Sequence, residues 1–212
     1  MKKVILALCV VMVMAECAFC EPVKLPDPDK NCPMTLTDAL TFRRSDRDFA
    51  DGDLTPQELS NLLWAAGGVN RPDGKLVYPV AMGKQDMTIY VFTREGVCKY
   101  DPKSHSLELI AEGDHRAETG QQDFVAKAAV NLAYVHDTEL WKEMKAPEEL
   151  VHRWGFAHTG AIMQNVYLYC ATAGWNCVVR GSFDSENLAK LMKLSPTQNI
   201  MLIHTVGKRP QN

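Results

Sequence analysis

The chain has 212 residues, of which 46% are hydrophobic and 23% are charged, and its formal net charge is −3. This mild acidity argues against nucleic acid as a partner, because no excess of Lys and Arg is present to displace counterions from a phosphate backbone. The length suffices for one domain with a sizeable core, and no internal repeat divides it.

Residues 1–20 have the pattern of a secretory signal peptide. Two lysines precede an apolar run at 4–15, and Ala18-Phe19-Cys20 places small residues at the two positions that a signal peptidase reads. The run is too short to predict a membrane span, so we expect none in the mature chain. We therefore expect cleavage near Cys20–Glu21 and export to the periplasm. Cleavage removes Lys2, Lys3 and Glu16, a net charge of +1, so the net charge would change from −3 to −4. A retained N-terminal anchor is the alternative.

Four cysteines follow residue 20, and an exported chain permits disulfides between them. They allow three connectivities, which the sequence does not rank. Their spacing matches no zinc motif, so no metal site is predicted. Their positions are Cys32, Cys98, Cys170 and Cys177.

The N-terminal half predicts an extended segment and two helices. Residues 21–34 are rich in Pro and Asp and should be extended, ahead of a single domain over 35–212. A short helix is expected over 37–43. Thr55-Pro56-Gln57-Glu58 is a capping box with proline at the first helical position, and it predicts a helix that Gly67-Gly68 ends.

The middle of the chain predicts a hairpin, a helix and a strand. The segments 88–93 and 97–100 flank Arg94-Glu95-Gly96, which is typical of a β-hairpin. A helix is expected over 118–127 and a buried strand over 129–136.

The C-terminal part begins with a long helix from Pro147 to Ala173, where Gly174 supplies a stop. A strand over 177–181, a helix from Ser185 to about Lys193 and a strand over 200–206 should follow. Hairpins and short links, instead of regular crossover units, favour an α+β fold over a doubly wound parallel one. We expect a mostly antiparallel central sheet flanked by helices.

Two cationic segments lie far apart in the sequence. Arg43-Arg44-Ser45-Asp46-Arg47 combines three guanidinium groups, which match phosphate oxygens in pairs, with a hydroxyl that can add another bond. Val206-Gly207-Lys208-Arg209 places two more cations directly after the last predicted strand. Taken singly, the first segment is as typical of solvated surface as of a phosphate site, and the second is more typical of solvated surface.

The long helix contains features that are unusual for a helix interior. Gly155 and Gly160 each cost stability there, and such glycines admit close approach by another backbone or a flat ligand. Simple helix packing is the alternative. Gln164-Asn165 is polar among apolar neighbours and should cap a backbone group or face a site. Beyond the helix, the stretch 174–183 pairs a strand end with glycine, which exposes backbone N–H groups to a planar heterocycle.

Together these segments resemble the nitroreductase family of flavin-dependent oxidoreductases, from about Thr37 to Arg209. The resemblance implies an intertwined homodimer that binds FMN at its interface. The features that carry it are Arg43-Arg44-Ser45 with Arg47 and Phe49, Leu62 to Gly68, Pro79 to Gln85, Gly160 with Gln164-Asn165, Gly174 to Gly181, and Val206-Gly207-Lys208.

The resemblance assigns roles around the cofactor. Arg43, Ser45, Lys208 and Arg209 would hold the FMN phosphate, and Arg44 would support that end.

At the ring, Arg47 would lie near the pyrimidine edge of the flavin, where positive charge stabilises the anion formed on reduction. Gln122, or alternatively Gln121, would hydrogen-bond the same edge. The backbone of Arg180-Gly181, with Val179 beside it, would face flavin N5.

The segment 79–85, with Met82, Gly83 and Gln85, would come from the partner subunit and cover the cofactor. The family pattern has serine where this chain has Val80 and asparagine where it has Gly83. Two polar contacts are thereby lost or moved to the backbone, so we expect weaker FMN retention or an altered substrate.

The implied reaction is a ping-pong hydride transfer through FMN to a small organic acceptor of nitroaromatic or quinone type. The donor would be NAD(P)H or, because nicotinamide cofactors are scarce outside the cytoplasm, another reduced carrier. The chemistry needs no titratable general acid, and the sequence shows no evident His–carboxylate constellation. The histidines are scattered, and no hydrolase motif is present. The alternatives are an exported, non-catalytic flavin- or ligand-binding protein and the dehydrogenase branch that oxidises azoline rings in peptides.

Overall fold

The computed structural model describes residues 21–32 and 34–211, so the signal-peptide prediction concerns residues outside the described ranges. The described residues form a seven-stranded sheet in the order β1-β4-β3-β2-β5-β7-β6, and every pairing in it is antiparallel. The predicted α+β fold is confirmed. The strands are β1 Val23–Lys24, β2 Met87–Phe92, β3 Gly96–Asp101, β4 Ser106–Glu112, β5 Val130–Asp137, β6 Trp175–Arg180 and β7 Gln198–Lys208.

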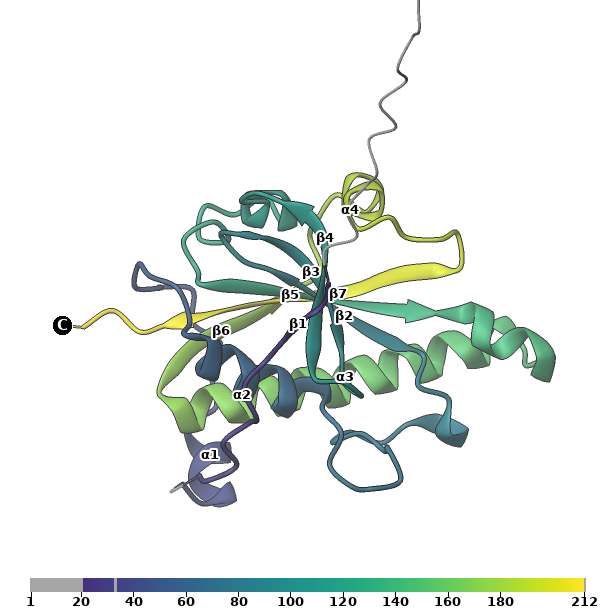
Figure 1. Ribbon diagram of the computed structural model, residues 1–212, viewed down its shortest axis with the longest axis horizontal. Coiled ribbons are helices and arrows are strands. Elements are labelled where there is room, and N and C mark those ends of the chain that lie inside the picture. Colours follow the sequence, from purple (N-terminus) through teal and green to yellow (C-terminus); the bar gives the residue numbers. More distant parts are fainter. Residues whose placement is uncertain (1–20, 33, 212) are drawn as a thin grey trace, which may run out of the picture.

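Helices cover both faces of this sheet. Figure 1 shows α1, α2 and α3 gathered below the sheet and α4 above it. No helix within the described ranges is long and apolar enough to cross a membrane. The α-helices are α1 Leu36–Phe42, α2 Pro56–Gly67, α3 Glu148–Ala173 and α4 Ser185–Leu191, and the short 3-10 turns are η1 Ala81–Gly83, η2 Arg116–Thr119 and η3 Thr138–Met144.

Local signals set the ends of the helices. The Thr55 side chain accepts the Glu58 N–H at 3.2 Å, and the Glu58 carboxylate accepts the Thr55 N–H at 2.7 Å, so the predicted capping box starts α2. Gly174 adopts φ +70° at the end of α3, a left-handed conformation that glycine reaches without strain.

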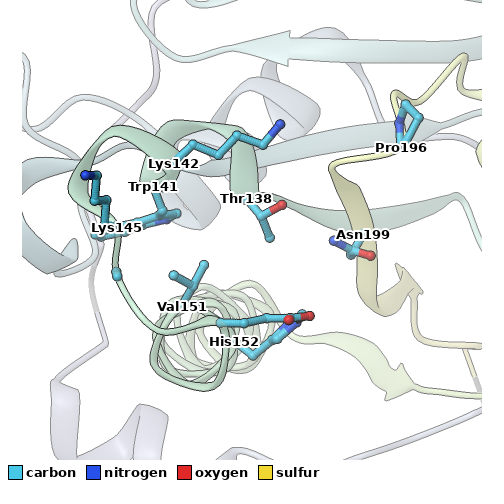
Figure 2. A pocket seen from close by; sticks show the side chains of 10 residues that line it. Thr138, Trp141, Lys142, Lys145, Val151, His152, Pro196 and Asn199 are labelled. Carbon is cyan, nitrogen blue, oxygen red and sulfur yellow. Dashed lines mark ion pairs between the residues drawn. The ribbon is translucent and has the colours of Figure 1, made fainter.

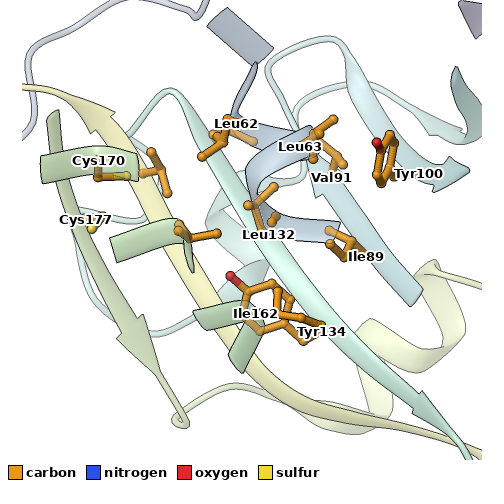
Figure 3. Close-up of a cluster of buried hydrophobic side chains, with 14 of the residues drawn as sticks. Leu62, Leu63, Ile89, Val91, Tyr100, Leu132, Tyr134, Ile162, Cys170 and Cys177 are labelled. Carbon is orange, nitrogen blue, oxygen red and sulfur yellow. The ribbon is translucent and has the colours of Figure 1, made fainter. Parts of the chain in front are cut away.

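Alternation along β5 divides the core into two clusters. Leu132 and Tyr134 face the α2–α3 side, where Figure 3 shows them beside Ile162. Ala133 packs with Leu188 of α4 in the second cluster. Successive side chains of a strand point to opposite faces, so one central strand serves both layers.

Two local predictions were wrong. The predicted helix over 118–127 is instead η2 followed by turns. Here the buried Arg116 side chain pairs with Asp114 and donates to the Ala128 carbonyl at 2.7 Å, which ties the segment down in a non-helical path. The N-cap of α4 is Asp184, which accepts the Asn187 N–H at 3.1 Å. Ser185, the predicted cap, is the first helical residue.

The two glycines of α3 have different surroundings. A Cβ at Gly155 would lie 2.5 Å from His136 Nδ1, because the helix backbone packs directly on that ring. A Cβ at Gly160 would meet nothing within 4 Å. The close approach that the sequence predicted is therefore made within this chain at Gly155 alone of the two.

Replacement of these glycines by alanine separates packing from helix propensity. Gly155→Ala should lower the free energy of unfolding by about 1–3 kcal/mol through overpacking against His136. Gly160→Ala should leave it unchanged or raise it by up to about 1 kcal/mol, because alanine favours helix and finds open space there. Urea unfolding of both variants measures the difference. Equal stability of the two variants would contradict the tight contact at Gly155.

Candidate functional site

The arginine segment, residues 43–49, leaves α1 and runs along the end of the sheet. Its Asp46 N–H donates to the Cys177 carbonyl of β6 at 3.0 Å, and the Ala50 N–H donates to the Lys208 carbonyl of β7 at 2.9 Å. Residues that are 131 and 158 positions apart in the sequence therefore lie side by side, as a shared phosphate site requires.

Asn176 ties the same two segments together. Its side-chain N–H donates to the Asp48 carbonyl at 2.6 Å, and its side-chain oxygen accepts from Arg209 Nε at 2.9 Å. Lys208 instead reaches α2, where its ammonium lies 2.8 Å from the Glu58 carboxylate. The backbone of Lys208 is thus at the site, while its charge is shared with Glu58.

The cations of the arginine segment differ in their partners. Arg44 pairs with Asp46. Within the described ranges, Arg43 and Arg47 have no carboxylate partner. Arg43 is half-buried, with its guanidinium 5.3 Å from the centre of the Tyr167 ring. These two cations are the ones available to an anionic ligand.

Tyr167 of α3 positions the serine of this segment. Its hydroxyl accepts the Val179 N–H at 3.0 Å and lies 2.8 Å from Ser45 Oγ. Because a backbone N–H can only donate, the tyrosine proton is left for the serine oxygen. Sequence reasoning missed Tyr167, since an aromatic residue between Ile162 and Cys170 in a helical pattern is typical of core.

Arg180 is a buried cation with neutral partners. Its guanidinium donates to the Thr119 carbonyl at 2.8 Å, to Asn131 Oδ1 at 3.1 Å and to the Thr205 hydroxyl at 2.8 Å. No carboxylate is paired with it in the described residues, and burial lowers its pKa to about 10. Its charge therefore acts on its surroundings without a neutralising partner.

Gln122 adds an acceptor beside this cation. Its side-chain oxygen is buried and has no hydrogen-bond partner in the described part of the chain. A Cβ at Gly120 would clash with Arg180 Nη1 and lie 2.9 Å from Gln122 Oε1, so both groups crowd the same glycine. Buried polar atoms are normally bonded, and an unbonded acceptor is one that a ligand can satisfy.

The loop of residues 79–85 is remote from the arginine segment of the same chain. Figure 1 shows it emerging below α3 on the side opposite α1. Met82 is 67% exposed, and the Gln85 amide donates to the Gly74 carbonyl at 2.8 Å. Of the predicted site residues, Met82, Gly83 and Gln85 are therefore not brought to Arg43 by one chain.

A buried His–carboxylate cluster, absent from the sequence prediction, lies behind this loop. Asp86 is 1% exposed and its carboxylate lies 2.8 Å from His158 Nδ1, 3.1 Å from His136 Nε2 and 2.8 Å from Trp141 Nε1. The three partners come from different elements, so their spacing gave no signal in the sequence. In the described residues no group of three or more His, Cys, Asp or Glu side chains is arranged to hold a metal ion.

A cavity of about 470 Å³ lies at the N-terminal end of α3, between η3, the first turns of α3 and β7 (Figure 2). Its lining includes Thr138, Trp141, His152 and Asn199, and none of the predicted site residues. His152 lies roughly 22 Å along the helix from Tyr167, given a rise of about 1.5 Å per residue. This cavity is therefore distinct from the cationic site.

Comparison with known proteins agrees with this architecture, which is the α+β fold of the nitroreductases. A crystal structure of a candidate nitroreductase from Ralstonia eutropha is 37% identical and covers 92% of each chain, with a TM-score of 0.84. A curated Methanocaldococcus jannaschii protein, named as a candidate nitroreductase, is 29% identical over 88% of this chain and 96% of its own. The NADPH:FMN oxidoreductase of Vibrio harveyi shares the fold, with 18% identity, coverage of 84% and 70%, and a TM-score of 0.63.

The sequence model of the nitroreductase family matches residues 40–208. The protein belongs to this family, whose members are generally flavin-dependent oxidoreductases, and the resemblance drawn from the sequence is confirmed.

His204 of β7 provides a titration test of this site. Its Nδ1 lies 3.0 Å from the Tyr134 hydroxyl, and its ring centre lies 4.6 Å from that of Tyr167. Burial, and secondarily the charge of Arg180, lowers the pKa of His204 to about 3. The unfolded chain, with an ordinary pKa near 6.5, then binds a proton that the folded chain excludes.

Stability should consequently fall as the pH drops below about 6.5. The His204 contribution is at most about 1.4 kcal/mol per pH unit, down to its folded pKa. Urea unfolding at pH 7, 6 and 5 should show a steeper loss in the natural protein than in a His204→Gln variant, which cannot titrate. Parallel slopes would show that His204 takes up a proton while folded.

Proposed function

We propose that the protein is an FMN-dependent oxidoreductase that uses NAD(P)H, or another reduced donor, to reduce a small organic acceptor of nitroaromatic or quinone type. The observation that carries the proposal is the meeting of the arginine segment with the C-terminal end of β7, through the Ala50–Lys208 hydrogen bond. Bound FMN would supply hydride acceptance and return at N5, while the protein supplies binding and electrostatics.

The residues present fit the phosphate of FMN. Arg43 lacks an acidic partner among the described residues, so a phosphate can bind it without displacing a carboxylate. Arg47, likewise unpaired there, stays available for the pyrimidine edge of the ring. Ser45 is held in place by Tyr167 and is ready to donate or accept. Arg209, which donates to Asn176, lies directly after β7 and can reach the same phosphate. Guanidinium–phosphate bonds are short and charge-assisted, so a few such groups suffice for retention.

The residues also fit the ring end of a flavin. The unbonded Gln122 oxygen can accept from an imide N–H of the pyrimidine edge. The charge of Arg180, which has neutral partners alone in the described residues, makes the local potential positive and so favours an anionic reduced ring. We assign the backbone of Val179, Arg180 and Gly181 to the N5 side of the cofactor, as the family resemblance implies.

A homodimer is part of the proposal. The 79–85 loop and α1 lie on opposite sides of one chain (Figure 1), so the loop can cover a flavin held by a second copy. The exposed Met82 side chain is available for such a contact.

The Vibrio harveyi structure was solved with NAD⁺, which supports a nicotinamide donor here. We further propose export to the periplasm, where the donor would be another reduced carrier.

A non-catalytic flavin-binding protein on the same scaffold is the second candidate. It is favoured by Val80 and Gly83, which offer no polar side chain at positions where the family pattern has serine and asparagine. Gly83 adopts φ +72°, so a side chain there would be strained.

Two measurements separate these candidates. Heat release of FMN from a yellow preparation would establish the cofactor, and a colourless protein that takes up no added FMN would refute both. Anaerobic mixing with NADH or NADPH then tests turnover. Bleaching of the flavin absorbance within seconds supports the enzyme, whereas an unbleached flavin, stable to both donors, favours the binding protein.

Loss of the unpaired Arg43 charge should weaken FMN binding. One charge-assisted hydrogen bond is worth about 1.5–3 kcal/mol, which corresponds to roughly 10- to 150-fold in Kd. Fluorescence titration of FMN into apoprotein measures Arg43→Ala against Arg153→Ala. Arg153 is an exposed α3 cation, paired with Glu149, and serves as the matched control. Equal affinities in the two variants would remove Arg43 from the phosphate site.

A further inference from the structure

The carboxylate of Asp86 is charged and buried, and it has no Lys or Arg partner in the described part of the chain. It lies at the end of the 79–85 loop, directly before β2, and its backbone carbonyl accepts the Asp137 N–H at 2.8 Å. Three ring N–H donors, from His136, Trp141 and His158, surround the two oxygens. A carboxylate that receives several N–H bonds is stabilised in its charged form.

His158 extends this cluster to the loop. Its Nε2 accepts the Ala81 N–H at 2.9 Å, while its Nδ1 lies 2.8 Å from Asp86 Oδ1. A backbone amide can only donate, so Nε2 must carry the lone pair and Nδ1 the proton. The network thus assigns a neutral imidazole in one tautomer, oriented by Asp86 and bonded to the loop.

Ala81, whose N–H is bonded to His158, is the first residue of a strained turn. Ala81 begins η1, in which Met82 has φ +52°, a left-handed conformation that costs a non-glycine residue of order 1–3 kcal/mol. Such a conformation persists only where surrounding contacts impose it. Within the turn, the Gly83 N–H reaches the Val80 carbonyl at a long 3.3 Å, whereas the His158–Ala81 bond anchors the turn to α3.

The loop also forms one wall of a cavity of about 450 Å³. Its lining includes Tyr78, Val80 and Gly83, together with two cations, Arg71 and Lys75. Displacement of Ala81 would therefore change the shape of this cavity as well as the position of Met82.

We propose that Asp86 and His158 are positioning residues that hold the 79–85 loop through the Ala81 amide. The consequence for cofactor retention rests on the proposed function, in which this loop covers the flavin of a second copy. Loss of the His158 acceptor would leave the Ala81 N–H without its partner and would remove a contact that holds the turn containing Met82.

The titratable groups that face His158 in the described residues are Asp86, His136 across it, and Tyr78, whose ring centre lies 6.5 Å away. Burial, then the charge of Asp86, raises the pKa of Tyr78, so it stays neutral. Burial would raise the pKa of Asp86, but hydrogen bonds from His136 and His158 outweigh it and bring the pKa to about 2. The Asp86 contribution to stability is present above its unfolded pKa near 3.9 and is lost only as the pH falls toward 2. Between pH 7.5 and 5, Asp86 therefore remains an anion that can accept the His158 Nδ1–H bond.

Hydrogen exchange of the full-length protein tests the proposal with a matched pair of variants. His158→Phe and His136→Phe each place a ring in the same core and each remove one donor from Asp86, but His158 alone of the two touches the loop. At pH 7.5, exchange of the 79–85 amides should rise at least tenfold in His158→Phe relative to His136→Phe. Equal exchange in the two variants overturns the proposal.

A second comparison does not depend on the folding of either phenylalanine variant. His158→Gln offers an amide oxygen to the Ala81 N–H, so protection of the amides of residues 80–85 at pH 7.5 should stay close to that of the natural protein. A loss of protection of tenfold or more in His158→Gln would overturn the role of the Ala81 hydrogen bond.

The exchange measurements are made without added FMN, so they separate this inference from the proposed function. A protein that binds no FMN but loses loop protection in His158→Phe supports the positioning role and refutes the flavin assignment. A protein that binds FMN and shows equal exchange in both phenylalanine variants refutes the positioning role and leaves the flavin assignment standing.

Discussion

The hydrogen bonds that join the arginine segment to β6 and β7 are the constraint on which the site depends. Asp46 and Ala50 donate to carbonyls of Cys177 and Lys208, and these strands are themselves paired in register, with Cys177 opposite Val206. The arginine segment is itself neither helix nor strand, so its course is set by these hydrogen bonds to the sheet. Because backbone groups carry this link, side chains such as Arg43 remain available for a ligand.

Buried polar groups connect that edge to the interior. Arg180 donates to neutral acceptors from η2, β5 and β7, which spreads its charge over three elements and leaves no carboxylate to cancel it. Its positive potential is one cause of the lowered pKa of His204, and burial is the larger cause. Replacement of such a cation by an apolar residue could increase stability, so its retention in the core points to an electrostatic role toward a ligand.

Features that depend on neighbouring residues could be predicted from the sequence, and features that depend on contacts across the fold could not. The capping box at Thr55 and the stop at Gly174 use residues within one turn, so their sequence signals were sufficient. The Asp86–His158 pair joins positions 72 residues apart, and neither residue lies in a motif. The predicted helix over 118–127 failed for the same reason, because the buried Arg116 side chain overrides local propensity there.

Helix α3 contacts both the arginine segment and the 79–85 loop. Near its C-terminal end Tyr167 holds Ser45, and nine residues earlier His158 holds Ala81, so about 14 Å of continuous helix separates the two anchors. An α-helix has a fixed rise per residue, and the packing of Gly155 on the His136 ring fixes the distance between the helix and the sheet. The arginine segment and the 79–85 loop are therefore both held by contacts with the same helix. In a dimer, the gap between the loop of one copy and the arginine segment of the other would then be set by how the two α3 helices are placed, with little freedom left to either segment.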